Sequence, residues 1–477
     1  MGQEISASHY DLGDFDRFHR KLTQETLLLS KLFDRQAFST RHPVAGFEIE
    51  AWLVDDNMAP APINDRFLSG LNDPLACEEL AKFNIELNSV PTPLAGNLGS
   101  RLAEQLQTTW NKARHQAESC NAHIIMIGTL PTLKQADLNL GNMSDLNRYR
   151  ALNEQILHSR GKPIHLDITG IEHLKTDHYD VMMESATTSF QIHTQVPLAI
   201  AHHFYNASII ASAPMVALCG NAPYLFGKNL WHESRIPLFE QAIETGGYAG
   251  AAQGPVKRVS FGTGYARKTI LECFQENLDH FPILLPEDLG PVSEIFEHLK
   301  LHNGTIWRWN RPLIGFDDDG TPHIRIEHRT PAAGPTVIDA IANALFFYGL
   351  TKNLCDEIID KGISVPFSQA KDNFYQAARY GLESPIVWLD GAKHRLQSLF
   401  VAELVARAVM GLKSLGISRC DIEDFLSIVQ HRIATKQTGS QWQRDFMTND
   451  PDDFTAMTRQ YLDNQNRGKP VSEWLIM

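Results

Sequence analysis

Residues 46–50 read Gly-Phe-Glu-Ile-Glu, and this stretch holds the side chains with the clearest potential for chemistry. Side chains of a strand point alternately to opposite faces, so Glu48 and Glu50 share one face while Phe47 and Ile49 share the other. Two carboxylates on one strand face repel each other, and Glu is an unfavourable strand residue. A bound cation would relieve the repulsion, so the stretch predicts a strand with a cation-binding face.

The same alternation recurs in three further segments of the chain. Their polar members are Asn84, Glu86 and Asn88, then Gln191, His193 and Gln195, then Arg325, Glu327 and Arg329. Carboxylates and amides are ligands for hard cations such as Mg²⁺, and the Arg fork binds phosphate or carboxylate oxygens. If these strands lie in one sheet, their polar faces form an acidic site edged by Arg and His and suited to Mg²⁺ and phosphates.

Each of these patterns also has an ordinary structural explanation. An antiparallel sheet with one solvated face shows the same alternation. His193 is suited to ligating a metal, contacting a nucleobase, hydrogen-bonding a ligating carboxylate, or packing as a structural histidine. Trp307 and Trp309 are typical of packing residues. The combination of acid, amide, His and Arg on several strands favours a functional face over a solvated one.

Composition narrows the class of protein. A chain of 477 residues with 43% hydrophobic and 21% charged residues is typical of a soluble globular protein. The net charge of −13 argues against a nucleic-acid partner or an anionic membrane. Six scattered cysteines without a C-x-x-C pair indicate neither a disulfide framework nor a zinc site, which favours the cytoplasm. We expect no signal peptide, since the first residues lack a basic segment followed by an apolar one, and no membrane span, since the most apolar run covers only residues 209–218.

The spacing of apolar residues predicts the elements that position these side chains. It predicts helices over 14–34, with Asp14 as N-cap, and over 98–120, and a mostly helical chain from 336 onward. Residues 305–329 read as a hairpin with Asp319-Gly320 as its turn. A two-residue turn would place Glu327 opposite Pro312, whereas a slip of one residue would place it beside Arg311; the sequence leaves both registers open.

Read in order, these segments resemble glutamate–cysteine ligase family 2, including its carboxylate–amine ligase members. The resemblance spans residues 40–445, and the shared order of short motifs carries it. The motifs are Gly46 to Glu50, the segment around Glu86, Ser189 to His193, Gly220 to Gly227, Trp307 to Pro312, Ile326 to Arg329 and, less securely, Thr438 to Trp442.

The resemblance implies an α+β fold: a curved antiparallel sheet of the glutamine-synthetase type, with helices on one face and a helical C-terminal part. We expect a catalytic sheet unit over 1–365 that binds ATP and Mg²⁺ and a mainly helical part over 366–477, unless the two form one domain. The implied reaction is ATP-dependent. ATP phosphorylates the side-chain carboxylate of glutamate, and an amine, typically that of cysteine, then displaces phosphate to form an amide. Such an enzyme would serve glutathione biosynthesis in the cytoplasm, acting on small molecules, and a homo-oligomer is left open.

The resemblance also implies roles for individual residues, carried over by position. The metal ligands would be Glu48, Glu50, Glu86, His193 and Glu327, and the catalytic residues would be Glu327 and Arg329. The nucleotide would be bound by Gln191, His193, Asn221 and Arg329. The substrate carboxylates would be bound by Arg311, Arg235 and Arg148. Because Glu48 and Glu50 lie two residues apart, we expect them to bind different Mg²⁺ ions.

Two departures from the family pattern leave the acceptor amine open. Thr330-Pro331 follows Arg329 where an acidic residue is expected soon after, and residues 307–309 read Trp-Arg-Trp where a Trp pair is common. The alternatives are the same ligase chemistry with another amine or acid, a guanidino or carboxyl phosphotransferase, and a nucleotide-binding module without turnover. The intact set of acids argues against the last.

Overall fold

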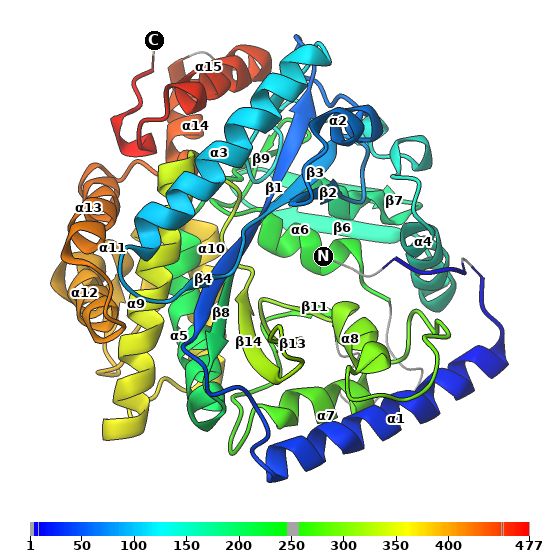
Figure 1. Ribbon diagram of the computed structural model, residues 1–477. Coiled ribbons are helices and arrows are strands. Elements are labelled where there is room, and N and C mark those ends of the chain that lie inside the picture. Colours follow the sequence, from blue (N-terminus) through cyan, green and yellow to red (C-terminus); the bar gives the residue numbers. More distant parts are fainter. Residues whose placement is uncertain (1–3, 8, 246–256, 450, 452, 477) are drawn as a thin grey trace.

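An antiparallel sheet forms the centre of the protein. The structure, a computed structural model, describes residues 4–7, 9–245, 257–449, 451 and 453–476. The eight-stranded sheet has the strand order β13-β14-β8-β1-β3-β2, and β4 and β5 join it by pairing with β1. All of these pairings are antiparallel. The sheet curls through the middle of the molecule with helices around it (Figure 1), which confirms the predicted fold class.

The elements have the following bounds. The strands are β1 (Val44–Val54), β2 (Ala76–Glu78), β3 (Asn84–Asn88), β4 (Thr92–Pro93), β5 (His123–Ile125), β6 (Ile164–Thr169), β7 (His173–His178), β8 (Phe190–Val196), β9 (Tyr224–Leu225), β10 (Lys228–Asn229), β11 (Val259–Ser260), β12 (Trp307–Arg308), β13 (Asn310–Phe316), β14 (Pro322–His328), β15 (Pro385–Val387) and β16 (Lys393–Arg395). The helices are α1 (Leu12–Asp34), α2 (Asn64–Leu71), α3 (Leu98–Ser119), α4 (Asn147–Arg160), α5 (Ala201–Leu218), α6 (Arg235–Ala242), α7 (Leu271–His280), α8 (Glu297–Gly304), α9 (Val337–Lys361), α10 (Phe367–Tyr380), α11 (Leu396–Leu399), α12 (Val405–Ser414), α13 (Arg419–Thr435), α14 (Gly439–Asn449) and α15 (Phe454–Arg467).

The apolar face of the sheet packs against helices, as the alternation in the sequence requires. Phe47 and Ile49 of β1 are 3% and 0% exposed. On this side α5 contacts β13 and β14, and α9 contacts β8. The hydroxyl of Tyr348 in α9 donates to the carbonyl oxygens of Gly46 (3.2 Å) and His193 (3.4 Å), which ties the helix to the two central strands. The polar face is thereby left for the site.

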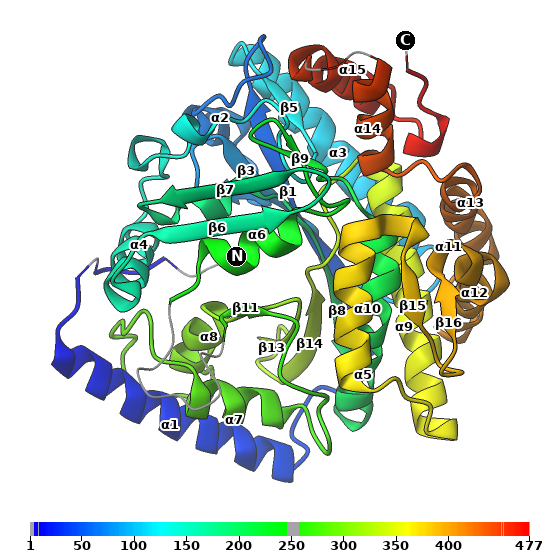
Figure 2. The same ribbon diagram turned by 180° about the vertical axis from the view of Figure 1, so that it is seen from behind.

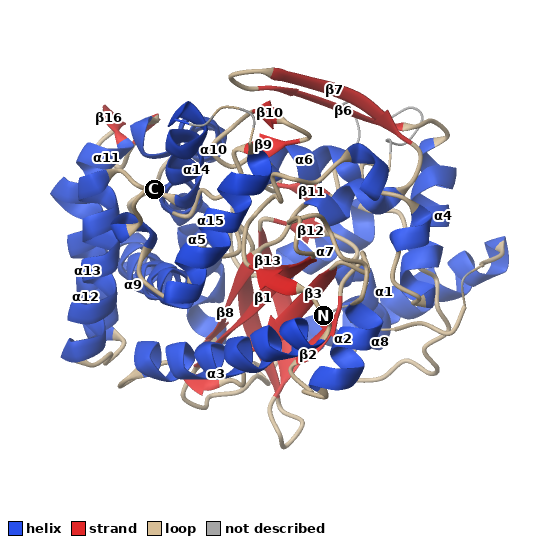
Figure 3. Ribbon diagram, turned by 90° about the horizontal axis from the view of Figure 1, so that it is seen from above, coloured by secondary structure: helices blue, strands red, loops and turns tan. Residues whose placement is uncertain are grey.

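Helices also enclose the hairpin end of the sheet, where α1 packs along α7 and α8 (Figure 3). The prediction of Asp14 as the N-cap of α1 is wrong by one turn. Asp11 is the N-cap and accepts from the amide of Asp14, whose carboxylate accepts from the amide of Asp11 in return. The reciprocal pair is a capping box, so Asp14 occupies its third helical position.

The structure decides the register of the β13–β14 hairpin. Arg311 pairs with Glu327, and the last pair before the turn is Phe316 with Pro322. The connection is therefore residues 317–321 rather than a two-residue turn, with Gly320 at φ +82° and the Asp317 amide donating to the Thr321 carbonyl. The longer loop shifts the pairing by one residue and brings Arg311 beside Glu327.

The C-terminal segments are mainly helical and pack on the helices behind the sheet. Helix α10 packs against α5, and α12 and α13 pack against α9 (Figure 2). The division at residue 365 stays a prediction. All six cysteines are free of disulfides. Within the part of the chain that the structure describes, no helix combines the length and apolarity needed to cross a membrane.

Candidate active site

The register of the sheet gathers the predicted polar side chains onto one face. Glu48 of β1 pairs with Gln191 of β8, and Glu50 pairs with Glu86 of β3. His193 of β8 pairs with Glu327 of β14. The four strands that carry the polar alternation therefore lie side by side, in the order β14-β8-β1-β3.

One group of potential metal ligands consists of Glu48, His193 and Glu327, whose ligand atoms lie within 4.8 Å of one another. His193 Nε2 lies 3.3 Å from Glu48 Oε1 and 3.9 Å from Glu327 Oε1. The His193 side chain is 7% exposed, and neither ring nitrogen has a well-aligned hydrogen bond to a described residue. A buried imidazole without such bonds is costly, and a metal ion bound to a ring nitrogen would remove the cost.

A second group consists of Glu50, Glu79 and Glu86, whose ligand atoms also lie within 4.8 Å of one another. Burial, reinforced by the charges of Glu86 and Glu50, raises the pKa of Glu79 well above its usual value. Burial also raises the pKa of Glu50, and Glu86 adds to the rise. Carboxylates crowded in this way form an oxygen-rich site for a hard cation, which would neutralise their repulsion. The second group therefore fits Mg²⁺ through oxygen ligands alone, and the first group offers it two carboxylates with the imidazole as a less usual third ligand.

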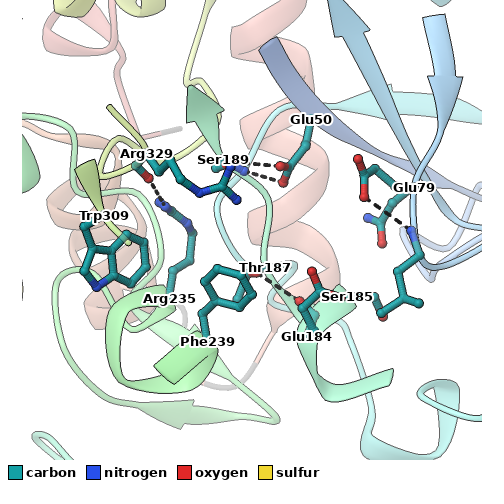
Figure 4. A pocket seen from close by; sticks show the side chains of 12 residues that line it. Glu50, Glu79, Glu184, Ser185, Thr187, Ser189, Arg235, Phe239, Trp309 and Arg329 are labelled. Atoms are coloured by element: carbon teal, nitrogen blue, oxygen red, sulfur yellow. Dashed lines mark hydrogen bonds between the residues drawn. The ribbon is translucent and has the colours of Figure 1, made fainter. Parts of the chain in front are cut away.

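Glu50 is held in place by the strand beside it. Its carboxylate accepts from the Ser189 amide (2.7 Å), the Ser189 hydroxyl (2.7 Å) and the Gln191 amide nitrogen (3.0 Å). Figure 4 shows Glu50 and Ser189 joined in this way at the wall of a small cavity of about 30 Å³, which we call the acidic chamber; its lining also includes Glu79, Glu184, Arg235, Phe239, Trp309 and Arg329. These donors fix the carboxylate on the polar face, with Glu79 nearby.

Two arginines supply positive charge beside the first group. Arg311 binds Glu327 as a fork, with Nε 2.8 Å from Oε2 and Nη2 2.9 Å from Oε1. Arg329 Nη1 lies 3.2 Å from Glu327 Oε2 and also donates to the Gln191 side-chain oxygen. Burial alone would raise the pKa of Glu327, but Arg311, Arg329 and His193 lower it to about 2. Glu327 is therefore anionic at neutral pH and can serve a metal.

The remaining predicted site residues lie in different places. Arg148 of α4 lines a cavity of about 440 Å³ together with Glu48, Glu50, Glu79, Glu86, Glu184, Gln191, Arg311 and Arg329. Arg235 is 2% exposed, and its guanidinium donates to the carbonyl oxygens of Thr330 and Arg329 (both 3.4 Å), directly beneath Arg329 (Figure 4). It lines the inner end of the chamber, next to Phe239 and Trp309.

Asn221 lies away from the carboxylates. It is 0% exposed, and its side-chain nitrogen donates to the Ala333 carbonyl (2.8 Å) and the Tyr461 hydroxyl (2.7 Å). Its side-chain oxygen accepts from Gln443 (2.9 Å). These bonds tie the loop after α5 to the C-terminal helices, and Asn221 lines neither the acidic chamber nor the cavity at Arg148.

Sequence reasoning missed Glu79 and Glu184. Glu79 directly follows β2, and Glu184 lies in a short 3₁₀ helix, Val181–Ala186, so neither belongs to a strand with a polar alternation. Both line the chamber with Glu50 and Arg329 (Figure 4). The available signal was their position just before two segments that were identified as site strands.

A pH-dependent effect on stability is expected for Glu184. Burial, followed by the charge of Glu50, raises the pKa of Glu184 from 4.5 to about 7. The folded protein therefore favours the protonated acid, and stability is lost as pH rises between these values. Glu184→Gln is neutral throughout, so without ATP and Mg²⁺ it should match the parent near pH 4.5 and unfold about 2 °C or more higher at pH 8. Differential scanning fluorimetry at both pH values measures the unfolding temperatures, with the exposed Glu423→Gln variant as control. If the unfolding temperature of Glu184→Gln exceeds that of the parent by the same amount at both pH values, the prediction is contradicted.

Two cavities meet at Glu48. One, of about 390 Å³, is lined by Phe47, Glu48, His193 and Arg325 at one end of the sheet. The other is the cavity at Arg148, which contacts both carboxylate groups. Glu48 of the first group thus lines both cavities, and Glu50 and Glu79 of the second group also line the chamber, together with Arg329 and Trp309.

Comparison with known proteins places the fold. Neither the protein-family models nor the curated proteins that were searched match the chain. A glutamate–cysteine ligase from Francisella tularensis, solved in complex with AMP, matches over 92% of this chain and 91% of its own, with a TM-score of 0.58 and 13% identity. The two proteins share a fold. At this identity the likeness extends to the arrangement of the elements alone.

Two more distant matches have TM-scores below 0.5. A bifunctional glutathione synthetase from Pasteurella multocida matches 93% of this chain with a TM-score of 0.48 and 11% identity, and this chain spans 55% of it. A ligase in complex with the prokaryotic ubiquitin-like protein Pup matches 92% of this chain with a TM-score of 0.35 and 10% identity, and 71% of that chain is covered.

Proposed function

We propose that the protein is an ATP- and Mg²⁺-dependent carboxylate–amine ligase, and specifically a glutamate–cysteine ligase that forms γ-glutamylcysteine through a γ-glutamyl phosphate. The observation that carries the proposal is the pair of ligand groups on one sheet face, flanked by Arg311 and Arg329. Oxygen-rich groups that hold two or more cations beside arginines suit phosphoryl transfer, in which catalysis is mostly positioning and charge neutralisation. The shared fold with a glutamate–cysteine ligase supports the choice of reaction.

The arrangement of the cavities suggests how the substrates are oriented. The nucleotide would occupy the cavity lined by Phe47 and Arg325, because its phosphates would then reach Glu48 and His193. The acid substrate would occupy the cavity at Arg148, because that cavity places an arginine, which can bind an α-carboxylate, beside both carboxylate groups. Its reacting carboxylate would meet the transferred phosphoryl group between the two groups.

The side chains of this protein would then divide the work. Glu48, His193 and Glu327 would hold one Mg²⁺ ion, and Glu50, Glu79 and Glu86 another; bound Mg²⁺ neutralises phosphate oxygens as charge develops. Arg329 would contact the transferred phosphoryl group, while Arg235 supports the backbone of Arg329 from below. The phosphorylated carboxylate has a good leaving group, which a free carboxylate lacks, so an amine can displace phosphate. The enclosing Phe239 and Trp309 would limit access of water to this intermediate.

The direct test is a product assay with single amines. The protein is incubated with ATP, Mg²⁺ and glutamate, amines are added one at a time, and phosphate release and new amides are followed by mass spectrometry. Turnover with cysteine and formation of γ-glutamylcysteine is the expected result. Amide formation with other amines alone would overturn the cysteine assignment but keep the ligase. A phosphorylated product without an amide would identify a phosphotransferase, and absence of any ATP turnover would reject both.

A further inference from the structure

Another cavity, of about 910 Å³, lies outside the candidate active site, where residues at the end of α10 and at the start of α14 contribute to its wall. Four distant segments build it: residues 169–171, 230–232, 376–385 and 435–445. No described residue that lines it also lines the acidic chamber or the cavities on the sheet. Its size is within the usual range for small-molecule sites. It also contains part of the Thr438 to Trp442 motif, for which the proposed reaction has no role.

The wall of this cavity contains Arg444, whose guanidinium is hydrogen-bonded only to neutral groups among the described residues. Arg444 donates to Asn229 Oδ1 (3.0 Å) and to the Leu230 carbonyl (2.9 Å), both neutral groups. Among the described residues, no carboxylate lies within ion-pair distance of it. Burial lowers the pKa of Arg444 to about 10. A desolvated guanidinium without a counter-ion is unfavourable, and an anionic ligand would relieve it.

The neighbours of Arg444 have the same electrostatic character. Arg379 donates to the Thr169 carbonyl (3.1 Å) and lies over the Trp231 ring at 4.8 Å, and its Nε is buried without an acceptor. Burial, followed by the charge of Arg444, lowers the pKa of His232 to about 3, so its ring is neutral. The surroundings of Arg444 thus disfavour any further positive charge and favour a negative one.

The wall also carries two acids, against the three basic side chains of Arg379, Lys436 and Arg444. Glu383 is shared between Lys436 (2.9 Å) and Arg395 (3.0 Å). Asp445 accepts a hydrogen bond from Gln441 at 2.8 Å. Apolar side chains complete the lining, among them Ile171, Leu230 and Leu382. The lining therefore has one more basic than acidic side chain, beside an apolar surface, in a protein whose net charge is −13.

We propose that this cavity is a binding site for a small organic anion, in which Arg444 and Arg379 bind a carboxylate or phosphate group and the apolar wall contacts the rest of the molecule. Arg forks bind either group bidentately. The site is separate from the proposed ligase chemistry, so it stands or falls independently of it.

The test uses three probes of the same shape: benzoate, phenyl phosphate and neutral phenol. Binding to the full-length protein is measured by isothermal titration calorimetry. At least one anion should bind and phenol should not; the anion that binds distinguishes a carboxylate site from a phosphate site. Arg444→Gln should weaken that binding by about tenfold or more, since a hydrogen bond to a charged group is lost. Arg444→Lys should retain part of it.

Two control variants and one further test variant locate the binding. The exposed Arg419→Gln removes a surface guanidinium and should change nothing. Arg148→Gln, in the candidate active site, should also leave the binding intact. Arg379→Gln repeats the test at a partly exposed residue, in case Arg444→Gln lowers the unfolding temperature too far. The proposal fails if neither anion binds, if phenol binds equally well, or if Arg148→Gln abolishes binding while the folded variants at Arg444 and Arg379 retain it.

Discussion

Replacing Glu327 by Gln is expected to lower ligase turnover by about 10²–10³-fold. The Glu327 carboxylate belongs to the first ligand group and is the partner of both Arg311 and Arg329. Gln keeps the shape but removes the charge, so a cation at Glu48 and His193 would be held less tightly and Arg329 would lose the partner that orients it. The measurement is kcat at saturating ATP and Mg²⁺, with the product assay described above.

The control for this variant is the same substitution at the surface. Glu423→Gln removes an exposed ion pair with Arg419 (2.6 Å), and such pairs contribute only about 0–1 kcal/mol to stability. It should retain full activity. Because Glu327 is 1% exposed and ion-paired, thermal unfolding must accompany the kinetics. His193→Gln tests the same group without removing a charge that the arginines need. Full activity in a folded Glu327→Gln or His193→Gln protein would contradict a metal role for the group.

The strand residues of the site could be predicted because the alternation of a strand decides which side chains share a face. Glu48, Glu50, Glu86 and His193 each stand in such a pattern, and one antiparallel sheet is enough to bring them together. The register of the hairpin could not be predicted, because it depends on the length of a turn. A connection of residues 317–321 rather than two residues moved Arg311 beside Glu327.

The residues that sequence reasoning did not find lie where no periodicity applies. Glu79 follows a strand, and Glu184 lies in a short 3₁₀ helix, so only tertiary packing brings them to the chamber. The type of a residue also does not tell whether its polar side chain is hydrogen-bonded inside the protein. Arg235 donates to backbone carbonyls and Asn221 to Ala333 and Tyr461, and neither bond leaves a pattern in the sequence. Their proposed contacts with substrate and nucleotide stay predictions.

The protein is expected to bind two divalent ions at separate groups, so that Glu48 and Glu50 serve different ions. Their side chains lie on one strand face, yet Glu48 falls in the group with His193 and Glu327, and Glu50 in the group with Glu79 and Glu86. Mn²⁺ prefers the same oxygen ligands as Mg²⁺ and can be counted by electron paramagnetic resonance. In the presence of ADP the parent protein should bind two Mn²⁺ ions, and Glu48→Gln and Glu50→Gln should each weaken one of them by about tenfold or more.

The two variants distinguish separate metal sites from a shared one, because each removes one carboxylate from the same strand. If the groups are independent, the double variant loses both ions and each single variant keeps one. If one ion bridged the two carboxylates, the parent protein would bind a single ion and both single variants would lose it. The surface variant Glu423→Gln is the control and should bind the same number of Mn²⁺ ions as the parent protein. The distinction matters for the reaction, since a cation at Glu48 would face the nucleotide cavity and one at Glu50 the acid substrate. Two ions would allow charge on both sides of the transferred phosphoryl group to be neutralised separately, which a single ion on β1 cannot do.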